Sequence, residues 1–204
     1  MMDVLVVTGG IGSGKTEVCR IIQELYGCGV YSADGRVKEL YHSCPELVLR
    51  IEDALEVGLR NEDGRFVPEL LAAVIFNDRD ALETVEFLVF PALADDFDSW
   101  AERYAGDRFV VFESATILEK PQLKGFGDKV LLVDAPFETR LERACGRDRV
   151  SREKILERMR NQKLMNMISE GASVPEADVV IVNDGGLEEL RLKVRTAVDD
   201  LFGN

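Results

Sequence analysis

A glycine-rich segment near the start of the chain has the residue types and spacing of a phosphate-binding loop. Residues 9–16 read Gly-Gly-Ile-Gly-Ser-Gly-Lys-Thr and fit the pattern G-x-x-x-x-G-K-[ST]. Small residues at five of these positions let the backbone curl, so that successive N–H groups point at phosphate oxygens. They are Gly9, Gly10, Gly12, Ser13 and Gly14. The segment is therefore expected to bind the phosphates of ATP.

The last two residues of this segment have separate expected roles. Lys15 would reach the β- and γ-phosphates, and the hydroxyl of Thr16 would coordinate Mg²⁺. A predicted strand ends at Thr8 and an amphipathic helix begins at Lys15, so the positive end of that helix would add to the site. This context favours phosphate binding over the alternative, a glycine-rich turn with a surface lysine.

Two carboxylates lie at the ends of later predicted strands, at the edge where open parallel sheets bind ligands: Asp34 follows the second strand and Glu113 ends the third. Asp34 could accept the proton of an acceptor hydroxyl that attacks the γ-phosphate, or it could cap the helix that follows. Glu113 could hold Mg²⁺ through water, or it could cap a helix or form a salt bridge. His42 is the only histidine in the sequence, so any general base is expected to be a carboxylate.

Positive charge is concentrated in residues 140–163, although the protein as a whole carries −13. Nine basic and four acidic residues give this segment +5, so the rest of the chain carries −18. Arg147 and Arg158 are candidates for a mobile lid that neutralises the transferred phosphoryl group, and a plain solvated helix is the alternative. The net negative charge argues against non-specific binding to nucleic acid.

Short apolar runs alternate with helix-period stretches, which is the pattern of parallel strands joined by crossover helices. Five strands are predicted: Val4–Thr8, Gly29–Ser32, Phe109–Glu113, Lys129–Asp134 and Val179–Val182. The sequence therefore predicts an α/β fold with a five-stranded parallel sheet flanked by helices.

The stretch between the second and third strands is too long for a simple crossover and contains no convincing strand. We expect an inserted helical region with four helices: Glu46–Val57, Pro68–Asn77, Asp80–Phe90 and Pro91–Tyr104. Such an insertion often supplies an acceptor pocket, and a structural cap on the sheet is the alternative.

The composition, 46% hydrophobic and 31% charged, is typical of a soluble globular protein. The apolar runs are too short to span a bilayer, and no basic region that would indicate a signal peptide precedes the first strand. The cysteines lack paired or zinc-like spacing and are interpreted as small buried hydrophobes in a reducing compartment. They are Cys19, Cys28, Cys44 and Cys145. A cytoplasmic protein with a small-molecule partner is expected.

Several segments together resemble one family over nearly the whole chain, the dephospho-CoA kinases. Residues 7–16 are similar to the family's P-loop, including the unusual Gly-Gly-Ile-Gly. Ser32-Ala33-Asp34 resembles its Asp-Ala-Asp, and residues 113–119 resemble its D-x-P-L-L-F-E. Residues 75–78 are similar to part of its acceptor-binding helices.

The second half of the chain extends the resemblance. Arg143-x-x-x-Arg147-Asp148-x-x-Ser151 and Arg158-x-x-x-Gln162 resemble the family's lid. Residues 177–185 are similar to its closing strand, A-D-x-V-I-x-N-x-G, which by analogy lies near the adenine.

The resemblance implies a P-loop kinase fold and phosphorylation of the ribose 3′-hydroxyl of 3′-dephospho-CoA by ATP with Mg²⁺. It implies Asp34 as the base, and Glu113 together with Thr16 at the metal. It also places Glu17, Arg143 and Asn183 at the nucleotide. The expected core consists of residues 1–44, 107–139 and 164–204. The acceptor-binding helical region is expected at residues 45–106, and the lid at residues 140–163.

Four positions depart from the family pattern, mainly in the acceptor-binding region. Ser32 replaces the first aspartate of Asp-Ala-Asp, Pro68 and Glu69 replace a basic pair, and Phe90 replaces the histidine of a His-Pro step. Two alternatives therefore stay open. One is a kinase for a nucleoside, a nucleotide or another metabolite, and the other is a degenerate nucleotide-binding module that regulates a partner.

Overall fold

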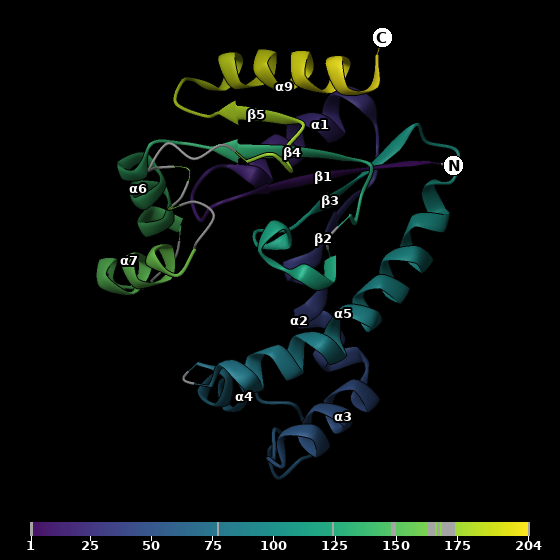
Figure 1. Ribbon diagram of the computed structural model, residues 1–204, viewed down its shortest axis with the longest axis vertical. Coiled ribbons are helices and arrows are strands. Elements are labelled where there is room, and N and C mark those ends of the chain that lie inside the picture. Colours follow the sequence, from purple (N-terminus) through teal and green to yellow (C-terminus); the bar gives the residue numbers. More distant parts are fainter. Residues whose placement is uncertain are drawn as a thin grey trace. The chain divides into compact units, whose positions relative to one another are not determined.

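The computed structural model describes residues 2–76, 78–123, 125–147, 150–162, 166, 168 and 174–203 of the chain (Figure 1). The chain divides into two compact units. We call Met1–Ser32 with Tyr104–Asn204 the sheet unit, and Ala33–Arg103 the helical unit.

The sheet unit is built on five parallel strands in the order β2-β3-β1-β4-β5. The strands are β1 (Asp3–Gly9), β2 (Val30–Ser32), β3 (Phe109–Glu113), β4 (Lys129–Asp134) and β5 (Val179–Val182). Because β1 lies between β3 and β4, the strand that leads into the glycine-rich loop is the centre of the sheet. The predicted five-stranded parallel sheet is confirmed.

Two helices of the sheet unit, α1 (Lys15–Tyr26) and α9 (Leu187–Phe202), pack together on one face of the sheet (Figure 1). Alternate residues of β1 are directed to this core, where Leu5 and Val7 are fully buried with Ile22 of α1 and Val194 of α9. Val6 of β1 is directed to the opposite face of the sheet and is also fully buried, so this central strand is apolar on both faces.

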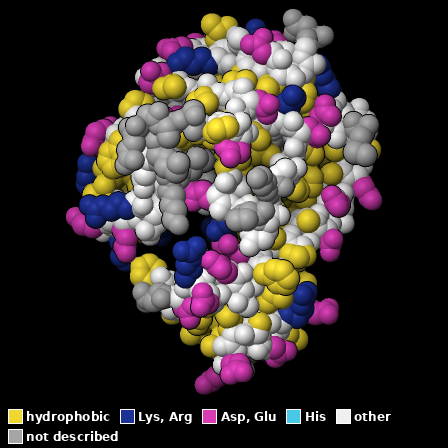
Figure 2. All heavy atoms as spheres, in the orientation of Figure 1, with side chains coloured by type: hydrophobic (Ala, Val, Ile, Leu, Met, Phe, Trp, Pro, Cys, Tyr) yellow, Lys and Arg dark blue, Asp and Glu magenta, His cyan; other side chains and the backbone are white. Residues whose placement is uncertain are grey.

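Two further helices, α6 (Phe137–Arg147) and α7 (Arg152–Arg160), follow β4. Two short 3₁₀ turns follow β3 in the sheet unit, η2 (Ile117–Glu119) and η3 (Pro121–Leu123). A third, η1 (Glu102–Tyr104), spans the boundary between the two units in the sequence. The face drawn in Figure 2 shows acidic side chains scattered over the surface, as the net charge of −13 requires. None of the helices in the described part of the chain is long and apolar enough to cross a membrane.

The helical unit contains α2 (Ala33–Ser43), α3 (Pro45–Leu55), α4 (Pro68–Ile75) and α5 (Arg79–Ala101), and the first three all contact α5. The prediction of separate helices at Asp80–Phe90 and Pro91–Tyr104 is wrong, because α5 continues through Pro91. One buried apolar residue per turn, from Ala81 to Phe97, runs across the proline. Pro91 itself is on the exposed side, where the missing hydrogen bond leaves a carbonyl that water can reach.

Candidate active site

The glycine-rich loop turns sharply between β1 and α1, and two of its glycines are required by the geometry. Gly12 and Gly14 have φ values of 75° and 99°, which side chains rarely tolerate. A Cβ atom at Gly12 would lie 2.0 Å from the carbonyl oxygen of Arg140, and one at Gly14 would lie 2.2 Å from Nδ2 of Asn183. The loop is therefore pressed against α6 on one side and against the end of β5 on the other.

Lys15 and Thr16 lie where the motif predicts, at the first turn of α1. The ammonium of Lys15 donates to the carbonyl oxygens of Gly9 and Gly10 at 2.9 and 3.1 Å, so it lies across the loop. The hydroxyl of Thr16 donates to Oε1 of Glu113 at 3.3 Å. The structure thus joins residues that are 97 positions apart in the sequence, because β3 runs beside β1.

The pair formed by Thr16 and Glu113 fits a hard divalent cation, since both side chains offer oxygen ligands. In the described ranges, no group of three or more His, Cys, Asp or Glu side chains is arranged to hold a metal ion. A cation at Thr16 and Glu113 would therefore need further oxygens from water and from nucleotide phosphates, which is the usual arrangement for Mg²⁺.

The other predicted nucleotide-binding residues line a hollow of about 260 Å³ beside the loop. Glu17, Arg143 and Asn183 all contribute to it, together with the glycines that precede α9. Nδ2 of Asn183 donates to the carbonyl oxygen of Ser13 at 2.9 Å, and Nη1 of Arg143 donates to the carbonyl oxygen of Asn183 at 3.2 Å. The hollow is thus tied to the loop by a short chain of hydrogen bonds.

The candidate lid arginines are on α6 and α7. Arg147 is the last residue of α6 and Arg158 is in the last turn of α7, and both are exposed. The two helices pack on each other and on Ile11 of the loop, through a small apolar cluster. Its buried members are Leu141, Ala144, Ile155 and Met159.

Sequence reasoning gave no role to two buried polar residues beside the loop. Oε1 of Gln162 accepts the N–H of Ile11 at 2.8 Å, and Gln162 is only 7% exposed. Arg140 is 3% exposed, and its Nε has no hydrogen-bond partner among the described residues. Burial lowers the pKa of Arg140 from its usual value. The only sequence signal for Gln162 was its place in the lid motif.

Asp34 belongs to the helical unit and is the second residue of α2. The helix begins at Ala33, and the exposed carboxylate of Asp34 has no hydrogen bond to any residue that the structure describes. The capping interpretation would require a bond from this carboxylate to a backbone N–H at the start of the helix. The structure therefore provides no support for capping and leaves this side chain available to a ligand.

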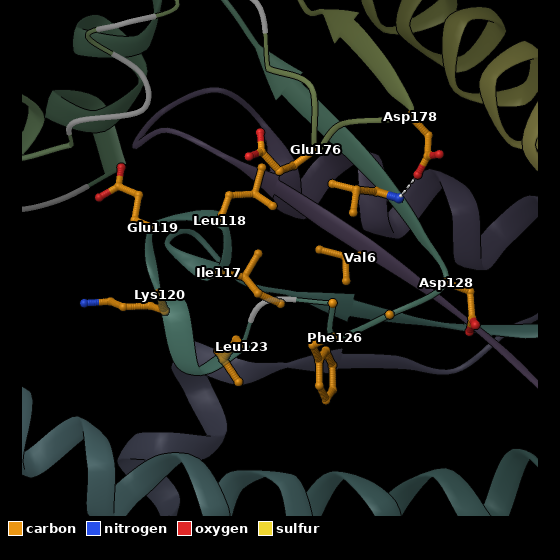
Figure 3. A pocket seen from close by; sticks show the side chains of 13 residues that line it. Val6, Ile117, Leu118, Glu119, Lys120, Leu123, Phe126, Asp128, Glu176 and Asp178 are labelled. Atoms are coloured by element: carbon orange, nitrogen blue, oxygen red, sulfur yellow. Dashed lines mark hydrogen bonds between the residues drawn. The ribbon is translucent and has the colours of Figure 1, made fainter.

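A larger cavity, of about 590 Å³, lies on the other face of the sheet (Figure 3). Two of its acidic residues have structural partners, because Asp128 accepts the N–H of Val4 and Asp178 accepts that of Val130, each at 2.8 Å. Figure 3 shows apolar side chains directed into the cavity and the ammonium of Lys120 directed away from it. We therefore do not assign the phosphate-binding chemistry to this cavity.

Comparison with known proteins identifies the group to which this site belongs. The family model described as dephospho-CoA kinase matches residues 3–189. The chain belongs to the dephospho-CoA kinase family. The resemblance found in the sequence is confirmed, and so is the prediction of a kinase.

Curated members of the dephospho-CoA kinase family match over most of their length. The dephospho-CoA kinase of Chlorobaculum tepidum is 32% identical over 202 residues, which cover 96% of this chain and 93% of that protein. The dephospho-CoA kinase of Porphyromonas gingivalis is 38% identical over 157 residues, which cover 77% and 76%.

Solved structures agree with the P-loop kinase fold of the family. A Thermus thermophilus protein superposes with a TM-score of 0.80 at 28% identity, over 99% of both chains. Dephospho-CoA kinase from Campylobacter jejuni, at 18% identity, has a TM-score of 0.58 over 100% of this chain and 99% of that one. Shikimate kinase from Acinetobacter baumannii, at 15% identity, has a TM-score of 0.55 over 98% and 93%. The last two comparisons support the fold alone.

Proposed function

We propose that this protein transfers the γ-phosphoryl group of ATP to the ribose 3′-hydroxyl of 3′-dephospho-CoA, which gives CoA and ADP. The observation that carries the proposal is the match of residues 3–189 to the dephospho-CoA kinase family. The geometry of Lys15, Thr16 and Glu113 agrees with it, because the ammonium of Lys15 lies on the loop and the hydroxyl of Thr16 donates to the carboxylate of Glu113, so two oxygens that could hold Mg²⁺ lie together.

The loop residues would bind the triphosphate. On binding, Lys15 would exchange its bonds to the carbonyls of Gly9 and Gly10 for bonds to the β- and γ-phosphates. Thr16 and Glu113 would hold Mg²⁺, which when bound neutralises charge on the phosphate oxygens. Asn183, Arg143 and Glu17 would line the nucleotide side of the loop.

The helical unit would hold the acceptor, and Asp34 would take the proton of its hydroxyl group. The carboxylate of Asp34 follows β2 and forms no hydrogen bond with any residue that the structure describes, so it could accept a proton from a ligand. Arg147 and Arg158 would close over the transferred group and stabilise its charge. The phosphoryl group needs little covalent help, so positioning and electrostatics provide most of the rate.

The acceptor is tested by measuring ADP release with ATP, Mg²⁺ and a panel of hydroxyl compounds. The panel contains 3′-dephospho-CoA, adenosine, adenosine 5′-phosphate and shikimate. We expect 3′-dephospho-CoA to give by far the highest kcat/KM. A higher kcat/KM with another member would assign the protein to a different acceptor, and ADP release with none of them would favour the regulatory module. We also propose that the protein works in the cytoplasm and that its substrate is a small molecule. Its free cysteines support the cytoplasmic location, because thiols are kept reduced in that compartment.

A further inference from the structure

The first turn of α2 carries the proposed base, and few side chains of that turn are buried. Helix α2 follows β2 without an intervening residue, and Asp34 is its second residue. The buried residues of α2 are Ala33 and Leu40, so the first turn buries a single methyl group. The exposed carboxylate of Asp34 has no hydrogen bond to any described residue. Its direction therefore depends on how the backbone of α2 is held.

An ion pair with two hydrogen bonds connects this turn of α2 to α5. Nε of Arg36 donates to Oδ2 of Asp96 at 2.9 Å, and Nη2 of the same guanidinium donates to Oδ1. The side chain of Asp96 is 19% exposed, and 60 positions of sequence separate the two partners. Such a bidentate contact fixes direction as well as distance, because the planar guanidinium and the planar carboxylate meet at two points.

The α5 end of this contact lies in a well-packed segment. Along α5, Asp96 comes between Leu93 and Phe97, which are 3% and 4% exposed. Helices α2, α3 and α4 all contact α5, so α5 is the helix on which the helical unit is assembled. Asp96 is therefore the anchored partner, and Arg36 is the partner whose helix the contact orients.

The place of Arg36 on α2 relates the contact to the base. Arg36 is two residues after Asp34, and at about 100° per residue the two side chains leave the helix about 200° apart. A rotation of α2 about its axis therefore turns both side chains by the same angle. The end of a side chain lies about 5–6 Å from the helix axis, so a rotation of about 10° moves a carboxylate by about 1 Å. A misplacement of that size can lower a reaction rate about 100-fold.

We propose that Arg36 and Asp96 are positioning residues for the phosphoryl transfer. Asp96, through Arg36, fixes the rotation of α2 and so directs Asp34 toward the acceptor hydroxyl. The inference rests on the proposed function, in which Asp34 takes the proton of that hydroxyl. The pair acts on kcat rather than on the binding of ATP. The alternative is an ion pair that only stabilises the helical unit.

The test compares Asp96→Ala with the control Glu39→Ala. Glu39 is another ion-pair partner of Arg36, but it lies on α2 itself, so its removal leaves the contact with α5 intact. We expect Asp96→Ala to lower kcat for 3′-dephospho-CoA by about 10- to 100-fold with an unchanged KM for ATP. Because a partly exposed ion pair contributes little to stability, Tm should fall by no more than about 4 °C. Glu39→Ala should keep the kcat of the wild type.

A double-mutant cycle with Asp34→Asn separates positioning from stabilisation. If the pair acts through the carboxylate of Asp34, Asp96→Ala should change the residual kcat of Asp34→Asn by less than about 2-fold. Arg36→Lys keeps the charge but not the planar fork, so it should lower kcat to a smaller extent and again only when Asp34 is present. This second variant gives the same test if Asp96→Ala does not fold.

Two results would overturn the inference while the proposed function stands. One is an equal loss of kcat from Asp96→Ala with and without the carboxylate of Asp34, and the other is an Asp96→Ala variant that behaves as Glu39→Ala. Full turnover by Asp34→Asn alone, or a wild-type protein that does not phosphorylate 3′-dephospho-CoA, would overturn the proposed function and the inference together.

Discussion

The bond between Gln162 and Ile11 gives a quantitative test of how the lid helices hold the phosphate-binding loop. Gln162 is 7% exposed, and its Oε1 accepts the N–H of Ile11 at 2.8 Å across 151 positions of sequence. Gln162→Leu keeps most of the side-chain volume and removes this acceptor, so the N–H of Ile11 is left without its partner. An unsatisfied buried donor costs about 1–3 kcal/mol. Because this bond is only partly buried, we expect the free energy of unfolding to fall by an amount at the lower end of that range.

The assay combines thermal melting with steady-state kinetics. For a chain of this size, each kcal/mol lost from the free energy of unfolding lowers Tm by about 2–4 °C. A loop that is no longer held by Gln162 should also bind the triphosphate less well, so KM for ATP should rise by roughly the factor of 5–10 that 1–1.4 kcal/mol corresponds to. Gln23→Leu, an exposed position on α1, controls for the change of residue type. A Gln162→Leu variant with the Tm and the KM for ATP of the wild type would refute the reasoning.

Two further predictions concern the loop and the thiols. Lys15→Ala should lower kcat by orders of magnitude with nearly unchanged melting, since Lys15 is at the phosphate-binding loop and its ammonium donates to the loop carbonyls of Gly9 and Gly10. Near-normal turnover of the folded variant would remove the loop from the mechanism. Burial raises the pKa of Cys28 to about 11, and Cys19 is also buried with a raised pKa, so at pH 8 a thiol reagent should modify both only after unfolding. Rapid labelling of either cysteine in the native protein, read by mass spectrometry, would contradict this.

Much of the sheet unit could be predicted from the sequence because its signals are local. Continuous apolar runs mark buried parallel strands, and the bounds of β3, β4 and β5 agree with the prediction. The glycine-rich motif placed Lys15 and Thr16, and the position of Glu113 at a strand end was enough to bring it to Thr16. These features depend on residue type and on neighbours in the chain.

Features that depend on tertiary contacts could not be predicted. A proline within a helical pattern is normally read as a boundary, but the buried stripe of α5 on both sides of Pro91 outweighs one missing hydrogen bond. The bond between Gln162 and Ile11 joins residues that are 151 positions apart in the sequence, so no local pattern predicts it. The role of Asp34 stays a prediction.

The measurement that tests the central proposal most directly is ³¹P NMR of the product made from ATP and 3′-dephospho-CoA, by the wild type and by Asp34→Asn. The wild type should produce one new phosphomonoester resonance, coupled to the ribose 3′-proton, in equal amount to ADP. Asp34→Asn should bind ATP normally and form that product at least 100-fold more slowly, since asparagine cannot accept the proton. ADP formation without a 3′-phosphomonoester, or full turnover by Asp34→Asn, would contradict the account.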